Sequence, residues 1–264
     1  MRARIVGPRA LALFGLLTAL LTFPSSLPAR DAASADRRPN IVFILADDLG
    51  YGDLGCYGQK RIKTPNLDRL AAEGRRFTQC YSGSTVCAPS RCSLMTGLHT
   101  GHTRIRGNDN LPLLAGDVTV AEVLKQAGYV TGVVGKWGLG DPGTPGHPNR
   151  QGFDEFFGFL NHWHAHNYYP DYLWKDEQKL PLTGNVAANG ISSQRAQYAP
   201  DLFVRNALDF IDRHKAGPFF LFYAPTLPHA NNERGATKGM AWKFRATLPT
   251  RAKPGPSRRR TTQP

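Results

Sequence analysis

Three short apolar runs, separated by segments of helical character, constrain the fold of this chain more than any other feature. Residues 41–45, 130–134 and 218–223 are rich in β-branched and aromatic residues and have the length of strands. Uninterrupted apolar runs of this kind are typical of parallel strands that are buried on both faces. We therefore expect an α/β fold with a mostly parallel sheet covered by helices.

Helical segments with recognisable ends lie between these runs. Residues 64–72 begin with a Thr-Pro pair and stop just before Gly74, which matches the preferred residues at both ends of a helix. Residues 119–127 form a second helical segment, and residues 201–214 form a third with apolar residues on one side. This alternation of strand and helix predicts βαβ units.

The first 35 residues have the pattern of a secretory signal peptide. Three arginines precede an apolar run at 10–23, and small residues at 32–35 offer cleavage sites. The run is shorter than the ~20 apolar residues of a membrane-spanning helix. We expect an exported protein, periplasmic or secreted, with no stable membrane span; an uncleaved N-terminal anchor is the alternative.

The net charge of +13 lies mainly at the two ends of the chain. The first 38 residues carry six Arg against two Asp, and residues 238–264 carry eight Lys or Arg and no acid, so the segment between them is nearly neutral. Residues 241–264 also lack any apolar period, which predicts a disordered basic tail. We expect no nucleic-acid partner, because an exported protein seldom meets one, and we place a single domain at 36–240.

Charged side chains follow each of the three predicted strands. Asp47 and Asp48 come after the first strand, Lys136 after the second, and His229 after the third. Open parallel sheets bind ligands beyond the carboxyl ends of their strands, so these side chains are expected to share one pocket. Two adjacent carboxylates suit a hard divalent cation, although the same pair is also good turn chemistry.

The segment from Cys87 to Arg91 (CAPSR) adds a cysteine at the start of a predicted short helix. Free backbone N–H groups at that position favour an anion, and Arg91 lies one turn further along. From the residues alone, Cys87 could be a reactive thiolate, a disulfide partner of Cys92 or a buried structural cysteine.

Six segments of the chain resemble the type I sulfatases of the alkaline-phosphatase-like superfamily. Residues 87–91 are similar to the signature C-x-P-S-R, at which this family oxidises the cysteine to formylglycine. The resemblance covers residues 39 to about 237 in one register. The other segments similar to the family are PNIVFILADDLG at 39–50, TPNLDRLA at 64–71, GKWGLG at 135–140, QGFD at 151–154, and the third strand with its following loop at 218–229.

The resemblance implies a formylglycine-dependent, metal-assisted hydrolase. Asp47 and Asp48 would bind a divalent cation, usually calcium in this family, together with the modified Cys87. One hydroxyl of the hydrated formylglycine would attack the sulfur of a sulfate ester, and Arg91 would steady this group. A formylglycine-generating maturation enzyme is the implied partner.

Two further residues receive roles from the same resemblance. Lys136 would contact the sulfate oxygens, and His229 would lie on the side of the leaving group. The family often has a histidine where this chain has Gly138, so the partner of the lysine must come from elsewhere. His164 and His166 are the candidates; they could instead bind substrate hydroxyl groups or belong to a surface loop, and we favour substrate binding.

Several alternatives stay open at this point. The family takes further metal ligands, a second lysine and a smaller subdomain from later sequence, which we do not find after His229. We therefore expect an N-terminal part of a sulfatase, lacking the C-terminal part of the fold, with little or no activity. An inactive remnant, a secreted module that binds sulfated glycans, and a related phosphonate or phosphate monoester hydrolase are the alternatives. The expected substrate is a sulfated carbohydrate or an aryl sulfate.

Overall fold

The computed structural model describes residues 38–231. The predicted signal peptide and the predicted basic tail lie outside this range, so the expectations for them stay predictions. Within the described range, no helix combines the length and the apolar character needed to cross a membrane.

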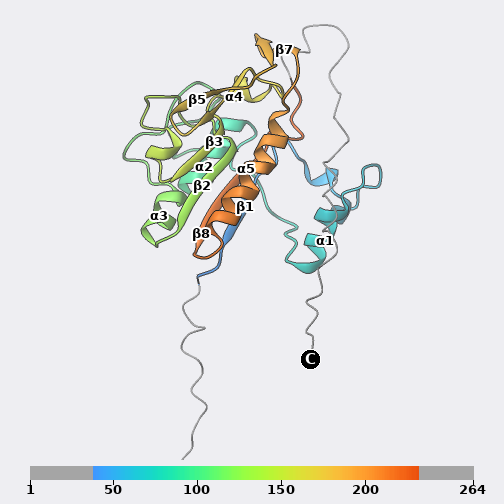
Figure 1. The fold of residues 1–264 in the computed structure, drawn as a ribbon. Coiled ribbons are helices and arrows are strands. Elements are labelled where there is room, and N and C mark those ends of the chain that lie inside the picture. The colour runs from blue at the N-terminus through green and yellow to red at the C-terminus, as the bar shows by residue number, and fades with distance from the viewer. Residues whose placement is uncertain (1–37, 232–264) are drawn as a thin grey trace, which may run out of the picture. The chain divides into compact units, whose positions relative to one another are not determined.

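A six-stranded sheet forms the centre of the described domain, in the order β1-β8-β2-β3-β4-β5 (Figure 1). The pairs β1–β8, β8–β2 and β2–β3 are parallel, whereas β3–β4 and β4–β5 are antiparallel. The predicted mostly parallel sheet is thus confirmed. The strand bounds are β1 Ile41–Ile44, β2 Val130–Lys136, β3 Glu155–Phe159, β4 Tyr172–Lys175, β5 Gln178–Pro181 and β8 Phe219–Ala224, and a separate hairpin holds β6 Val186–Ala188 and β7 Ile191–Gln194.

The helices predicted from sequence are present within a few residues of their expected ends. Thr119 caps α3, because its side chain accepts a hydrogen bond from the Glu122 backbone while the Glu122 carboxylate binds the Thr119 N–H. The bounds are α1 Pro65–Glu73, α2 Cys87–Thr96, α3 Val120–Gln126, α4 His162–Ala165 and α5 Ala199–His214, with short 3-10 turns η2 Tyr51–Asp53, η3 Gly55–Tyr57 and η4 Pro148–Arg150.

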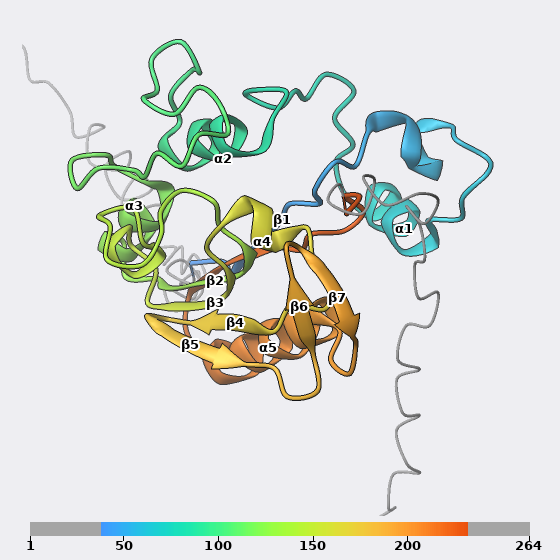
Figure 2. The same cartoon turned by 90° about the horizontal axis from the view of Figure 1, so that it is seen from above.

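Side chains that alternate along the central strands divide the core between the two faces of the sheet. Phe220 and Phe222 of β8 belong to one apolar cluster, with Ala88 of α2 and Ala121 of α3. Residues of the opposite parity on β8 and β2 belong to a second cluster, with Phe203, Ala207 and Phe210 of α5. Figure 2 shows the resulting arrangement, with α2 and α3 on one side of the central strands and α5 on the other.

The expectation that strand 41–45 is buried on both faces is wrong. β1 is the edge strand next to β8, and Val42 and Ile44 are 46% and 59% exposed. An apolar run has the same sequence whether the strand is central or at an edge, because burial depends on what packs against it. Within residues 38–231, nothing covers this strand as α5 covers β8.

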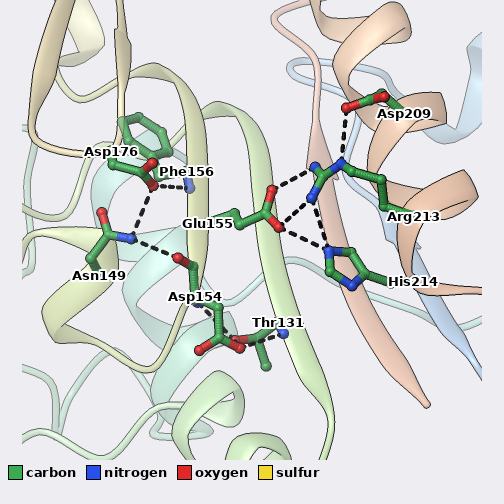
Figure 3. Close-up of polar contacts among 9 residues, drawn as sticks. All are labelled: Thr131, Asn149, Asp154, Glu155, Phe156, Asp176, Asp209, Arg213 and His214. Carbon is green, nitrogen blue, oxygen red and sulfur yellow. Dashed lines mark hydrogen bonds and ion pairs between the residues drawn. The ribbon is translucent and has the colours of Figure 1, made fainter. Parts of the chain in front are cut away.

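Polar side chains join the start of β3 to β2 and α5 (Figure 3). These contacts lie at the amino-terminal ends of the strands, opposite the carboxyl ends that carry the site residues. The Thr131 backbone N–H and hydroxyl both donate to Oδ2 of Asp154, at 2.9 and 3.0 Å. Arg213 of α5 makes two 2.7 Å hydrogen bonds to Glu155. These bonds lower the pKa of the Glu155 carboxyl group. The fork geometry ties the helix to the start of β3.

Candidate active site

The order of the strands brings the predicted site residues to one edge of the sheet. Asp47 and Asp48 follow β1, His229 follows β8, and Lys136 is the last residue of β2. These three strands are neighbours and parallel, so their carboxyl ends lie together.

Backbone contacts join the segment that follows β1 to the segment that follows β8. The Asp47 N–H donates to the carbonyl oxygen of Leu227 at 3.0 Å, and Asp47 also forms an isolated parallel bridge with Pro228. Asp48 adopts a φ of 59°, a left-handed conformation that aspartate tolerates better than most residues. Its carboxylate lies 3.3 Å from Nε2 of His229.

The Asp47 carboxylate is buried between two cations. Oδ2 accepts a 2.9 Å hydrogen bond from Nζ of the fully buried Lys136, and Oδ1 lies 3.5 Å from the Arg91 guanidinium. Arg91 also donates to the carbonyl oxygen of Lys136 at 2.5 Å. Burial would raise the pKa of Asp47, but the two positive charges outweigh it, and the pKa is lowered. The carboxylate is therefore ionised at neutral pH.

Cys87 is the first residue of α2, and its thiol faces this cluster. Nζ of Lys136 lies 3.4 Å from Sγ. Burial would raise the pKa of Cys87, but the hydrogen bond with His229 and the charge of Lys136 outweigh it, so the pKa is lowered. The same hydrogen bond raises the pKa of His229. In a converted protein, the formylglycine oxygens would occupy the position of this sulfur.

Glycines allow the chain to pass close to this edge of the sheet. Gly135 has a φ of 117°, and a Cβ atom there would lie 2.0 Å from the carbonyl oxygen of Ala224 on β8. Gly138 has a φ of 79°, and a Cβ atom there would lie 2.1 Å from the ring of His162. A side chain at Gly135 would therefore push β2 away from β8, and one at Gly138 would displace the His162 ring.

His162 is the site residue that the sequence analysis missed. Its buried ring occupies the space beside Gly138, where His164 or His166 had been expected to provide a partner for the lysine. Burial lowers the pKa of His162 to about 3, and the charges of Lys136 and Arg91 act in the same direction. The imidazole is therefore neutral.

The two predicted histidines lie on different sides of α4. The His166 ring stacks on the His229 ring, with centroids 4.3 Å apart and planes inclined by 15°. The His164 ring packs on Tyr172 at 4.2 Å and lines a cavity that is separate from the Cys87 cluster. The structure thus brings His166, but not His164, to the group of side chains at the strand ends, where it contacts His229.

The donor chemistry of the cluster fits a hard divalent cation only in part. Asp47 and Asp48 supply carboxylate oxygens, which calcium prefers, but calcium takes about six to eight oxygens. Among residues 38–231, no group of three or more His, Cys, Asp or Glu side chains is arranged to hold a metal ion. The remaining ligands would have to come from water or from outside this range.

All four cysteines of the chain are free. The Cys87–Cys92 disulfide that the sequence left open is therefore not formed. Cys92 is a buried core residue, and burial raises the pKa of its thiol. The two cysteines thus differ in environment, although they lie on the same helix.

We predict that this difference governs thiol alkylation. In chain that has not been converted to formylglycine, iodoacetamide should modify Cys87 below the pH at which an ordinary thiol reacts, because its lowered pKa favours the thiolate. His229→Gln should raise that pKa and move the pH-rate profile upward. Peptide mass analysis measures both rates, with Cys92 as the unreactive reference. An unchanged profile in His229→Gln would contradict the Cys87–His229 contact.

Comparison with known proteins gives the family. The Sulfatase family model matches residues 39–258. N-acetylgalactosamine-6-sulfatase from Canis lupus familiaris is 35% identical over 224 residues, which cover 75% of this chain and 41% of the relative. Human Arylsulfatase G is 49% identical over 128 residues, covering 46% and 24%. The chain belongs to the sulfatase family.

Solved structures agree with this assignment. A crystal structure of Ps i-CgsB in complex with k-i-k-neocarrahexaose has a TM-score of 0.62 and 34% identity, covering 73% of this chain and 46% of that one. A structure bound to its substrate D-glucosamine-2-N,6-O-disulfate has a TM-score of 0.59 and 33% identity, covering 73% and 35%. The chain thus spans less than half the length of these proteins.

Proposed function

We propose that this site hydrolyses sulfate esters through a formylglycine made from Cys87. The observation that carries the proposal is the convergence of Lys136, Arg91 and His229 around Cys87 and the buried Asp47 carboxylate. Cationic groups in a water-excluded site stabilise the charge that develops on a transferring oxyanion. Membership of the sulfatase family supports the same chemistry.

In the proposed reaction, one hydroxyl of the hydrated formylglycine loses its proton and attacks the sulfur. The bond from sulfur to the ester oxygen breaks, and His229, on the leaving-group side, supplies a proton to the departing alcohol. Lys136 contacts the sulfate oxygens, and Arg91 steadies the nucleophile. Loss of a proton from the second hydroxyl then re-forms the aldehyde and expels sulfate.

The Cys87 signature favours sulfate ester hydrolysis over the related hydrolysis of phosphate or phosphonate monoesters. Phosphate or phosphonate monoester hydrolysis uses a similar tetrahedral oxyanion, but an aldehyde made from cysteine is the mark of the sulfatases that this segment resembles. Oxidation of Cys87 requires a formylglycine-generating maturation enzyme, which we propose as a partner. We also propose an exported, periplasmic or secreted location, supported by the signal-peptide pattern at 1–35.

We propose that Asp47 and Asp48 bind one calcium ion, which would supply positive charge next to the nucleophile when bound. Calcium should then raise the melting temperature of the chain and slow its proteolysis, because a ligand that binds only the folded state stabilises it. Asp47→Asn and Asp48→Asn should each weaken the calcium effect. Thermal scans with calcium, with magnesium and with chelator measure this. No calcium dependence in the unaltered chain would contradict the site.

Release of sulfate tests the function itself. The chain, co-produced with a maturation enzyme, is incubated with a chromogenic aryl sulfate and with the matching aryl phosphate, and Cys87→Ala serves as the control. Cys87-dependent release from the sulfate ester alone supports the proposal, whereas a preference for the phosphate ester favours the related phosphatase.

A second candidate function follows from the incomplete donor set. A site whose residues within 38–231 supply only part of the oxygens that calcium takes can bind a sulfated glycan without hydrolysing it. If the converted chain releases no sulfate yet binds a sulfated oligosaccharide, the inactive remnant or glycan-binding module replaces the hydrolase.

A further inference from the structure

A cavity separate from the Cys87 cluster lies between α4, β4 and the β6–β7 hairpin. Its volume is about 570 Å³, within the ~300–1,000 Å³ range of small-molecule sites. Figure 2 shows the hairpin beside the end of the sheet that carries α4 and β4. The side chains that matter for its chemistry are Asn161, Trp163, His164, Asp171, Tyr172 and Trp174.

Four aromatic rings, those of Trp163, His164, Tyr172 and Trp174, form part of the cavity wall. Trp163 is 60% exposed although it is a large apolar residue, which leaves its ring available to a ligand. His164 packs on Tyr172 at 4.2 Å, and Tyr172 makes an edge-to-face contact with Trp174 at 6.0 Å. Such packing fixes the rings before a ligand arrives. The C–H face of a sugar ring is apolar and fits against a fixed aromatic surface.

The polar groups of the cavity suit hydroxyl groups and disfavour anions. Amides of Asn161 and Asn167 and carboxylates of Asp141 and Asp171 are among the lining groups, and they can accept or donate hydrogen bonds. Among the described lining residues there is no Lys or Arg.

Two nearby basic side chains do not reverse this balance. Burial lowers the pKa of His164 to about 4, so its ring is neutral at pH 7. Nζ of Lys179 lies 3.6 Å from the centre of the Tyr172 ring and is not part of the lining. The lining side chains therefore carry negative charge from Asp141 and Asp171, with the Lys179 ammonium beside them, in contrast to the cationic groups around Cys87.

Two connections join the cavity to the candidate active site. Helix α4 carries Trp163 and His164 at the cavity, and the same short segment carries His166, whose ring stacks on His229. On the other side, the side chain of Asn231 donates to the carbonyl oxygen of Gly190 in the hairpin turn, at 3.1 Å. The segments that line or contact the cavity thus also carry residues of the candidate active site.

We propose that this cavity binds an uncharged sugar unit of the substrate, next to the unit that carries the sulfate. The inference rests on the proposed function and adds its substrate class: an oligosaccharide with a neutral residue beside the sulfated one. The aromatic walls supply stacking, the amides and carboxylates bind hydroxyl groups, and the two carboxylates exclude a uronic acid or a second sulfate at this position.

Binding is measured with the full chain carrying Cys87→Ala, so that no hydrolysis occurs. Neutral disaccharides built from glucose, galactose or N-acetylgalactosamine, and the counterparts in which one unit is a uronic acid, are titrated by saturation-transfer NMR and calorimetry. At least one neutral disaccharide should bind about tenfold or more tightly than its uronic acid counterpart. Equal or tighter binding of the acids, or no binding of any neutral sugar, would overturn the proposal.

Variants locate the binding. Trp163→Ala should weaken the neutral sugar about tenfold, by removing an apolar contact surface, and Asp171→Lys should reduce or reverse the discrimination against uronic acids. Phe77→Ala removes an aromatic side chain that is 64% exposed and does not line the cavity. It should change neither the affinity for the neutral sugar nor the discrimination against uronic acids. If Trp163→Ala and Phe77→Ala both leave binding unchanged, the sugar is not in this cavity.

The outcomes separate this inference from the proposed function. Sugar binding without sulfate release by the converted chain would overturn the hydrolase and retain a glycan-binding cavity. Sulfate release from an aryl ester with no sugar binding would retain the hydrolase and overturn the cavity.

Discussion

Asp47→Asn should destabilise the chain by about 3–5 kcal/mol in the presence of a chelator, the cost of breaking a buried ion pair. The carboxylate is buried between the Lys136 ammonium at 2.9 Å and the Arg91 guanidinium at 3.5 Å. An amide at position 47 removes the negative charge, and both cations then stay buried without it. Urea unfolding at pH 7 measures the difference in the free energy of unfolding.

The effect should depend on pH with a definite sign. Asp47 has a lowered pKa in the folded chain, so it contributes stability above the unfolded pKa of an aspartate, and this contribution is lost as the pH falls through the folded value. The difference in the free energy of unfolding between the unaltered chain and Asp47→Asn should therefore become smaller in acid. Asp48→Asn is the matched control: that side chain is 65% exposed, and we expect a loss below about 1 kcal/mol. Equal losses from the two variants would contradict the buried pairing.

Where the converted chain turns over a sulfate ester, Cys87→Ser should abolish that turnover, with a loss on the order of a millionfold, the scale seen when a catalytic nucleophile is removed. A serine hydroxyl can attack the sulfur, but it has no second hydroxyl from which an aldehyde could re-form. Each chain should then release at most one alcohol and retain the sulfate on position 87. Rapid-mixing kinetics measures the burst, and the mass of the chain after the reaction measures the retained sulfate.

Cys80→Ser is the control for this variant. Cys80 is exposed and lies seven residues before Cys87, so its replacement should leave turnover unchanged. Full turnover by Cys87→Ser would show that the reaction does not need the aldehyde, and it would favour a phosphatase-like use of the site.

Local sequence patterns predicted the part of the fold on which the site depends. The runs that became β1, β2 and β8 were recognisable because they are short, apolar and β-branched or aromatic. The antiparallel strands β4 and β5 carry no such signal, since β5 is exposed along its whole length and contains Lys179 and Pro181. The exposure of β1 could not be predicted either, because it depends on which strands and helices pack beside it.

The site was predictable where it follows the ends of strands, and less so within α4. Asp47, Lys136 and His229 come together because β1, β8 and β2 are adjacent. His162 and His166 are four residues apart and lie toward the site, whereas His164 between them lines the cavity. The spacing contained this information, but it becomes readable only once residues 162–165 are known to be helical.

The mass of one peptide tests most directly whether Cys87 becomes formylglycine. Trypsin cuts after Arg76 and Arg91, so peptide 77–91 contains both Cys80 and Cys87. Fragmentation of this peptide, from chain co-produced with a maturation enzyme and then treated with a thiol reagent, assigns each position. We predict an aldehyde at position 87 and a labelled thiol at Cys80. A labelled thiol at both positions would show that Cys87 is not converted to formylglycine.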